Sequence, residues 1–355
     1  MTLKSNVLVI SVSNNAKGGV ASVVTTFMKN DFLNDLYNIH YFHSNDPSGK
    51  FKKHWSFLLA IIYFPFLLLL NRFDVAHIHG SLKGSFTRKS YFLFWLRVFS
   101  IPTIYQCHAA EVEQFFNGLS HAKRNIVVKI FKKYQLCLCL GTSWVKKFET
   151  LTYRDWEVLF NPVPELTLNK EKHSTCNFSF MGELSDRKGI KDLIHAFAKA
   201  ENDNARLLVA GNGDVNSLVT LCSELGISEK VEFLGWINKE QKLDLLARTD
   251  VVVLPSYAEG LPMSILEAMS VGIPVITTPV GAVEDAITHN EHGLLVQPGN
   301  IAQIADALSE LDHDSNKRTQ LGEAAKIKFL KCFQDDVVAE ALSDYYQQLI
   351  DGVKK

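Results

Sequence analysis

The chain has 355 residues, of which 47% are apolar and 21% are charged. This length exceeds the usual size of one hydrophobic core and predicts two domains, and the ordinary composition excludes long disordered stretches. The formal net charge of −1 hides an asymmetry: residues 1–160 contain 19 Lys and Arg against 9 Asp and Glu, and residues 161–355 contain 18 against 29. A domain with such a positive excess is drawn to anionic surfaces.

The first half of the chain alternates β-rich runs with helical sequence. A short apolar run at 7–12 is followed by a glycine-containing loop and by helical sequence at 20–28, an order that opens nucleotide-binding α/β units. Helical crossovers between such runs imply a parallel sheet. We expect its further strands at 75–79, 101–107 and 136–140.

One segment, from Trp55 to Leu70, is almost unbroken apolar sequence between Lys53 and Arg72. It has sixteen residues and contains Pro65, whereas a spanning helix needs about 20 residues. We therefore predict a core helix, or a helix lying in the membrane interface, rather than a span.

Basic residues of the first half are interleaved with aromatic and aliphatic runs, which favours an anionic membrane over nucleic acid as the partner. A solvated basic face without a partner is the alternative. The clusters are Lys50/Lys52/Lys53, Lys83/Arg88/Lys89, Lys123/Arg124 and Lys129/Lys132/Lys133.

The second half repeats the α/β pattern. Pro162 and Pro164, followed by polar sequence at 169–175, predict a domain linker. We expect strands at 177–181, 206–210, 231–233, 250–254 and 274–277, and helices at 301–311 and 335–350. The predicted α/β architecture is two doubly wound domains, 1–160 and 161–335, with a C-terminal helix, 336–355, that packs back toward the first domain.

The sequence gives no sign of a metal, a cofactor or a secretory signal. The cysteines lack a Cys-x-x-Cys pair or other metal-ligand spacing, and the first apolar run is too short for a signal peptide, so we expect a cytoplasmic protein. His77 and His79 stand at the end of a predicted strand. We expect their rings on opposite faces, which disfavours a shared metal ion.

The most informative stretch lies between 250 and 281. A buried strand is followed by Glu259 and Pro262 and then by a helix that contains Glu267. Pro262 suits the first helical turn, and the amides that begin a helix attract phosphate together with the helix dipole. Because eight helical positions span about 12 Å, the two glutamates are expected to contact opposite ends of an extended ligand such as a nucleotide sugar.

Glu259, seven residues and Glu267 resemble the E-x7-E signature of the retaining family 4 glycosyltransferases of GT-B fold. The match continues through 256–262, Gly272-Ile273-Pro274-Val275-Ile276, Gly281 and Gly293-Leu294-Leu295-Val296. The resemblance covers essentially the whole chain and implies two Rossmann-like domains facing a central cleft, the first for the acceptor and the second for the nucleotide sugar. It places Glu259 at the donor sugar as a catalytic residue, Glu267 at the ribose, and Gly260 and Leu261 beside the donor.

A second segment, from Phe180 to Gly189, looks like the Gly-Arg…Lys-Gly stretch with which the family binds diphosphate. The resemblance assigns Gly182 and Lys188 to the donor, and Lys188 also to catalysis, because a cation offsets the charge that gathers on a departing diphosphate. The segment departs from the pattern at Glu183, where the family usually has arginine. Arg187 either supplies that charge or is a surface residue. Gly211 is a further donor-binding candidate.

In the first domain, the stretch from Asn15 to Val20 looks like the glycine loop of the family, although a plain tight turn fits it equally well. The resemblance assigns Gly18 to the acceptor and Gly19 to the donor. His108, with Glu111 after it, resembles the family's His-Gly-x-Asp/Glu position beside the reacting sugar. It implies a catalytic His108 that holds a donor hydroxyl or the acceptor, and a Glu111 that orients the acceptor.

Arg88 and Lys89, within the basic half, are further candidates for binding the acceptor. Together with these features, the resemblance implies retaining, metal-independent transfer of a hexose from a UDP- or GDP-linked sugar. The expected acceptor is a lipid-linked saccharide, such as a polyprenyl-diphosphate oligosaccharide of polysaccharide or lipopolysaccharide biosynthesis, reached from the inner face of the cytoplasmic membrane.

Three other functions are alternatives to sugar transfer. A nucleotide-sugar epimerase of the same fold would change the donor alone, and a non-catalytic protein would bind nucleotide sugar without turnover, a reading that Glu183 supports. A nicotinamide dehydrogenase would need a Gly-x-Gly-x-x-Gly turn, which neither Gly18-Gly19 nor Gly211-Asn212-Gly213-Asp214 completes.

Overall fold

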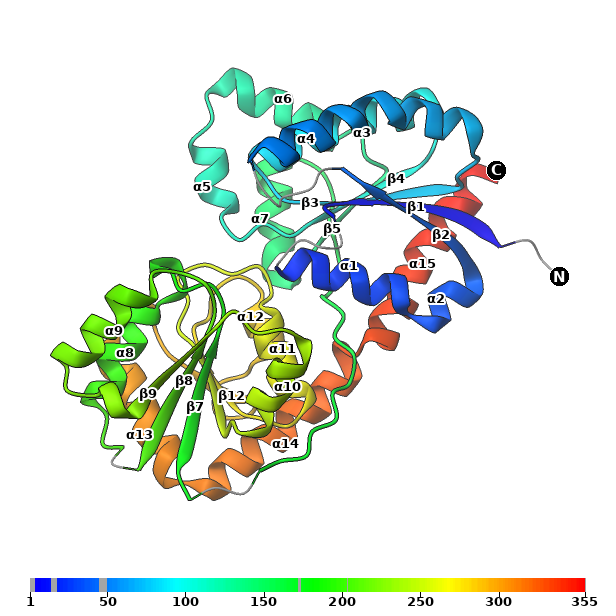
Figure 1. Cartoon of the computed structure of the whole chain (residues 1–355). Coiled ribbons are helices and arrows are strands. Elements are labelled where there is room, and N and C mark those ends of the chain that lie inside the picture. The colour runs from blue at the N-terminus through cyan, green and yellow to red at the C-terminus, as the bar shows by residue number, and fades with distance from the viewer. Residues whose placement is uncertain (1–3, 14–17, 45–49, 172–173, 203, 355) are drawn as a thin grey trace. The chain divides into compact units, whose positions relative to one another are not determined.

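The computed structural model describes residues 4–13, 18–44, 50–171, 174–202 and 204–354. The chain forms two compact units, residues 1–162 with 335–355 and residues 163–334. Each unit contains a six-stranded parallel sheet flanked by helices (Figure 1). The doubly wound α/β class predicted from the sequence is confirmed.

The sheet of the first unit has the strand order β2-β1-β3-β4-β5-β6. Because helices cover both faces of such a sheet, its inner strands are buried along their whole length. The strands are β1 (Ser5–Ser11), β2 (Tyr37–His43), β3 (Val75–Gly80), β4 (Thr103–Cys107), β5 (Leu136–Cys139) and β6 (Glu157–Val158). The helices are α1 (Gly19–Lys29), α2 (Asp31–Leu36), α3 (Lys50–Leu70), α4 (Gly84–Val98), α5 (Val112–Asn117), α6 (His121–Phe131), α7 (Thr142–Thr152) and α15 (Asp335–Lys354).

The C-terminal helix α15 belongs to this first unit, where it packs against α1, α2 and β3. The Asn30 side-chain amide donates to Asp336 Oδ1 at 2.8 Å, and the hydroxyls of Tyr37 and Ser343 lie 2.9 Å apart. In Figure 1, α1, α2 and α15 lie on one face of the sheet, and α3, α4 and α6 lie on the other.

Helix α3 differs from the predicted core helix because only one of its sides is buried. Ala60, Phe64 and Leu68 face the unit, while large apolar side chains on the opposite side are exposed. The helix continues through Pro65. No helix among the described residues is long and apolar enough to cross a membrane. The side chains of Lys50, Lys52 and Lys53 fall outside the part that the structure describes.

The sheet of the second unit has the strand order β12-β11-β10-β7-β8-β9. Several of its helices begin at an Asn or Asp cap, such as Asn238 with a full capping box. The strands are β7 (Cys176–Met181), β8 (Ala205–Ala210), β9 (Val231–Gly235), β10 (Val251–Leu254), β11 (Val275–Thr277) and β12 (Gly293–Leu295). The helices are α8 (Ile190–Lys199), α9 (Val215–Glu224), α10 (Lys239–Ala247), α11 (Met263–Ser270), α12 (Val283–Ala286), α13 (Ile301–His313) and α14 (Ser315–Cys332), with 3-10 turns η1 (Asp186–Lys188) and η2 (Ser228–Lys230).

Both sheets contain a point at which the strand order reverses. In the first unit it lies between β1 and β3, and in the second between β7 and β10. Open α/β sheets bind their ligands beyond the carboxyl ends of the strands at such a switch point. We therefore expect a ligand-binding site among the residues that follow β1, β3, β7 and β10.

Candidate functional site

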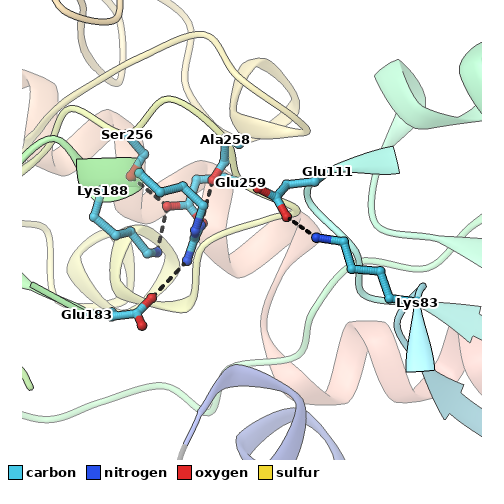
Figure 2. A network of polar contacts seen from close by, with 8 residues as sticks. Lys83, Glu111, Glu183, Lys188, Ser256, Ala258 and Glu259 are labelled. Atoms are coloured by element: carbon cyan, nitrogen blue, oxygen red, sulfur yellow. Dashed lines mark hydrogen bonds and ion pairs between the residues drawn. The ribbon is translucent and has the colours of Figure 1, made fainter. Parts of the chain in front are cut away.

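Three polar side chains meet at the switch point of the second unit. Lys188, which ends the turn after β7, donates from its ammonium to Glu259 Oε1 at 2.6 Å. The Ser256 hydroxyl, just after β10, donates to the same oxygen at 2.6 Å (Figure 2). Glu259 is only 6% exposed, and a buried carboxylate is stable when it is paired and hydrogen-bonded in this way. The structure thus brings together two residues predicted separately from the sequence.

Backbone packing holds the loops of Lys188 and Glu259 together. Gly189 has a φ of +69°, and a Cβ atom there would lie 2.2 Å from the Pro255 carbonyl oxygen. Gly281 has a φ of +63°, and its Cβ would lie 2.0 Å from the Glu259 carbonyl oxygen. Neither position tolerates a side chain, so backbone contacts fix the geometry of the pair.

Arg187 also faces the Glu259 loop. Its guanidinium donates to the Ala258 carbonyl at 2.8 Å and lies 3.4 Å from Glu183 Oε2. Glu183, which stands where the family usually has arginine, is itself exposed. Arg187 therefore contacts the loop that carries Glu259, as Lys188 does, and is not only a surface residue.

Glu267 lies on α11 and is 8% exposed. The Lys242 ammonium of α10 contacts its carboxylate. Burial raises the pKa of Glu267, and the charge and hydrogen bond of Lys242 oppose that rise. Glu267 is therefore a buried carboxylate whose cationic partner is Lys242.

The remaining donor candidates lie in the segments that follow β7, β8 and β10. Gly182 follows β7 and its amide donates to the Ala210 carbonyl at 3.0 Å, while Gly211 follows β8. Gly260 accepts a hydrogen bond from the Ala282 amide at 2.8 Å, and Leu261 is buried. One detail of the prediction is wrong: Pro262 caps α11 instead of lying in its first turn, because its ψ of 125° is extended and the helix begins at Met263.

Three histidines stack in the first unit. The rings of His77 and His79 lie 4.1 Å apart, and those of His79 and His108 lie 5.3 Å apart. His79 Nδ1 is 3.1 Å from His108 Nε2, and His77 Nδ1 is 2.8 Å from the Tyr346 hydroxyl of α15. The expectation that His77 and His79 point to opposite faces is wrong, since residues two apart in a strand share a face.

The other candidates of the first unit occupy varied positions. Gly18 precedes α1 with a φ of +132°, and Gly19 is the first residue of that helix. The rest of the predicted glycine loop, residues 15–17, lies outside the described part of the chain. Glu111 forms an ion pair with Lys83 at 3.0 Å (Figure 2).

Lys89 is not the surface residue that its basic cluster predicts. It is 1% exposed, and its ammonium donates to Ser44 Oγ at 2.6 Å. Burial, with the nearby charge of Arg88, lowers the pKa of Lys89. The cause is helical periodicity, because Lys89 falls on the buried stripe of α4 formed by Phe86, Phe92, Leu93 and Leu96. Arg88 is only half-buried.

Comparison with known proteins identifies the family. A model described as "Glycosyl transferases group 1" matches residues 169–328. The uncharacterized glycosyltransferase MJ1607 of Methanocaldococcus jannaschii is 37% identical over 306 residues, which make up 79% of this chain and 76% of that protein. The chain belongs to the group 1, or family 4, glycosyltransferases. This is a family of retaining enzymes that take a sugar from a nucleotide sugar.

Other similar proteins place this glycosyltransferase in the GT-B fold. Sucrose-phosphate synthase from Thermosynechococcus elongatus superposes with a TM-score of 0.84 at 17% identity, over 98% of this chain and 100% of that one. Anabaena HepE in complex with UDP-glucose gives 0.77 at 17% identity, over 97% and 99%. The lipopolysaccharide core biosynthesis glycosyltransferase LpsE of Rhizobium meliloti is 32% identical over 171 residues, and the matched region spans 48% of each chain.

Four polar residues of the glycosyltransferase make contacts described above, although the sequence analysis assigned them no role. They are Ser256, Lys242, His79 and Tyr346. The signal for His79 was present, because it lies on the same strand face as His77, at the strand end. Ser256 stands within the matched string around Glu259. Nothing in the local sequence pairs Lys242 with Glu267 or Tyr346 with His77.

The histidine stack predicts that the glycosyltransferase loses stability in acid. Burial lowers the pKa of His77 and of His108 to about 3, and that of His79 well below its usual value. Because the unfolded chain binds protons near pH 6.5 and the folded stack does not, the free energy of unfolding falls as the pH drops from about 6.5 toward 4.

This acid sensitivity is measurable by urea unfolding across that range. Replacing His77 with Gln removes one titrating ring and is expected to reduce the pH slope, by at most about 1.4 kcal/mol per pH unit. His121→Gln, at an exposed position, is the control and should leave the slope unchanged. An equal slope in the wild type and in His77→Gln would show that the ring is not held neutral.

Proposed function

We propose that this glycosyltransferase moves a hexose from a UDP- or GDP-linked sugar to a lipid-linked saccharide in polysaccharide or lipopolysaccharide biosynthesis, without a metal ion. The observation that supports the donor half of the proposal most is the buried Lys188–Glu259 pair at the switch point of the second unit. Its relative from Rhizobium meliloti, which acts in lipopolysaccharide core biosynthesis, supports the acceptor class.

The donor binds along the E-x7-E segment in this proposal. Glu267 accepts hydrogen bonds from the ribose hydroxyls, and Lys188 with Arg187 faces the diphosphate. Glu259 lies at the sugar. As the bond from C1 to the phosphate oxygen lengthens, negative charge gathers on the diphosphate, and fixed cations in a partly buried site stabilise that charge. Lys188 supplies the cation from a side chain that is 14% exposed.

Retention follows from attack on the face that the diphosphate leaves. The acceptor hydroxyl approaches C1 on that side, and its proton passes to a phosphate oxygen, so no enzyme nucleophile is needed. Neutral His108 holds a hydroxyl of the reacting sugar or acceptor by a hydrogen bond, and Glu111 orients the acceptor. Because the acceptor is bound to a lipid, the enzyme works peripherally at the anionic inner face of the cytoplasmic membrane.

A panel of UDP-, GDP- and ADP-sugars with the free nucleotides tests the donor by thermal shift. One nucleotide series is expected to raise the melting temperature, since a ligand at a hundred times its Kd stabilises by about 2.7 kcal/mol. Glu267→Ala should lose that shift, and Glu284→Ala, an exposed acid of α12, should keep it. No shift with any nucleotide sugar contradicts the proposal.

Product analysis separates the remaining functions. A transferase leaves the donor unchanged without acceptor, apart from slow hydrolysis, and releases nucleoside diphosphate when a saccharide acceptor is added. An epimerase changes the donor alone, and a binding protein gives the thermal shift without any product.

A further inference from the structure

The solvent-facing side of α3 carries a continuous apolar stripe. Eight of its large hydrophobic side chains are exposed, from 46% at Leu58 to 79% at Leu70, and they recur every three or four residues. The stripe consists of Trp55, Leu58, Leu59, Ile62, Tyr63, Phe66, Leu69 and Leu70. Monomeric soluble proteins rarely expose so large an apolar patch, and such patches mark interaction sites.

Helix α4 lies beside α3 and widens this apolar surface. The Tyr91 hydroxyl donates to the Ile61 carbonyl at 2.8 Å, and the rings of Phe57 and Phe92 lie 6.3 Å apart, so the two helices are packed together. On the solvent side, α4 exposes Phe94 and Val98. The stripe and these two residues are called the α3 face below.

The helices on this side of the sheet carry charged residues of one sign. Helices α3, α4 and α6, on the same side of the sheet (Figure 1), contain nine Lys and Arg residues and no Asp or Glu. Of these nine, Lys89 is buried. Helices α1, α2 and α15, on the opposite side, contain two Lys and seven Asp and Glu. The charge asymmetry of the sequence is thus concentrated on the side that is also apolar.

We propose that the α3 face inserts into the headgroup region of an anionic phospholipid bilayer, with α3 lying along the surface. A helix with an apolar side and a basic surround binds such an interface, its apolar side entering about 5–10 Å. A second copy of the chain fits less well, because a symmetric contact sets the patch against itself and brings like charges together. The inference deepens the proposed function, on which it rests for a lipid-linked acceptor, by assigning the surface that reaches it.

Vesicle co-sedimentation of the full chain tests this surface. The probe is vesicles of phosphatidylcholine with a third of phosphatidylglycerol, compared with vesicles of phosphatidylcholine alone, at low and high salt. We expect tighter binding to the anionic vesicles, and part of the binding should persist at high salt, because apolar insertion is not screened.

The decisive variant is Ile62→Ser with Phe66→Ser, which should lower the partition coefficient at least about tenfold, since each side chain contributes through its apolar area. Its matched control is Phe32→Ser with Leu36→Ser, two exposed apolar residues of α2 on the opposite side, with less than about a twofold effect. Both variants should keep the nucleotide-sugar thermal shift, which shows that they are folded.

Three results overturn the assignment: no binding by the wild type, equal binding by the α3 variant and the wild type, or a dimer that the α3 substitutions dissociate. None of them depends on sugar transfer. If transfer to an acceptor is measured while vesicle binding fails, the α3 face is wrong and the proposed function stands. If vesicle binding is measured but no nucleotide sugar gives a thermal shift, the α3 face stands and the proposed function is wrong.

Discussion

Replacing Lys188 with Met is expected to lower kcat at saturating donor by about 10²- to 10³-fold, as loss of one preorganised charge-stabilising group does. The methionine keeps the length of the side chain and removes the ammonium that donates to Glu259 Oε1 at 2.6 Å. The measurement is release of nucleoside diphosphate at saturating donor and acceptor.

Lys191→Met is the matched control for Lys188. Lys191 lies three residues further along and forms an ion pair with Asp186 at 2.9 Å, but both side chains are more than half exposed. Such surface pairs contribute at most about 1 kcal/mol, so kcat should stay within about twofold of the wild type. Equal losses in the two variants would mean that a general charge effect, and not the site, sets the rate.

The second large effect is expected for Glu259→Gln. Glutamine has nearly the same shape and still accepts the hydrogen bond of the Ser256 hydroxyl, but it removes the negative charge that we propose lies at the donor sugar. We expect kcat to fall about 10²-fold or more, with Glu284→Gln, at an exposed position, as the control. Wild-type turnover by Glu259→Gln at saturating donor is incompatible with the assigned role.

A double variant separates a joint action of Lys188 and Glu259 from two independent ones. Residues in direct contact show non-additive effects. Lys188→Met with Glu259→Gln is therefore expected to lose less rate than the product of the two single losses. Simple multiplication of the two losses would indicate that the ion pair is not the functional unit.

Long buried strands were the most predictable part of the fold. The runs predicted at 75–79 and 136–140 match β3 and β5 within one residue, because a parallel strand covered on both faces is buried and rich in apolar residues. Strand β2 was missed: it lies at the sheet edge, and its sequence Tyr-Asn-Ile-His-Tyr-Phe-His is partly exposed. Strands β6 and β12, of two and three residues, are too short for a periodic signal.

In the candidate site, the structure brings together residues that the sequence singled out from separate local motifs. Glu259 and Lys188 were each singled out from the resemblance of their own motif. They meet although 71 positions separate them, because both motifs follow strands that adjoin in the sheet. Lys242 could not be found, since its contact with Glu267 depends on how α10 packs. Lys89 was misplaced because charge was weighed above the helical spacing that buries it.

A crystal structure of the chain with its nucleotide-sugar donor tests the central claim most directly. The account predicts the diphosphate within hydrogen-bond distance of Lys188 Nζ, the ribose hydroxyls on the Glu267 carboxylate and the hexose beside Glu259. A donor bound away from the carboxyl ends of β7 and β10, with the contact between Lys188 and Glu259 unchanged and no phosphate near it, would contradict the account.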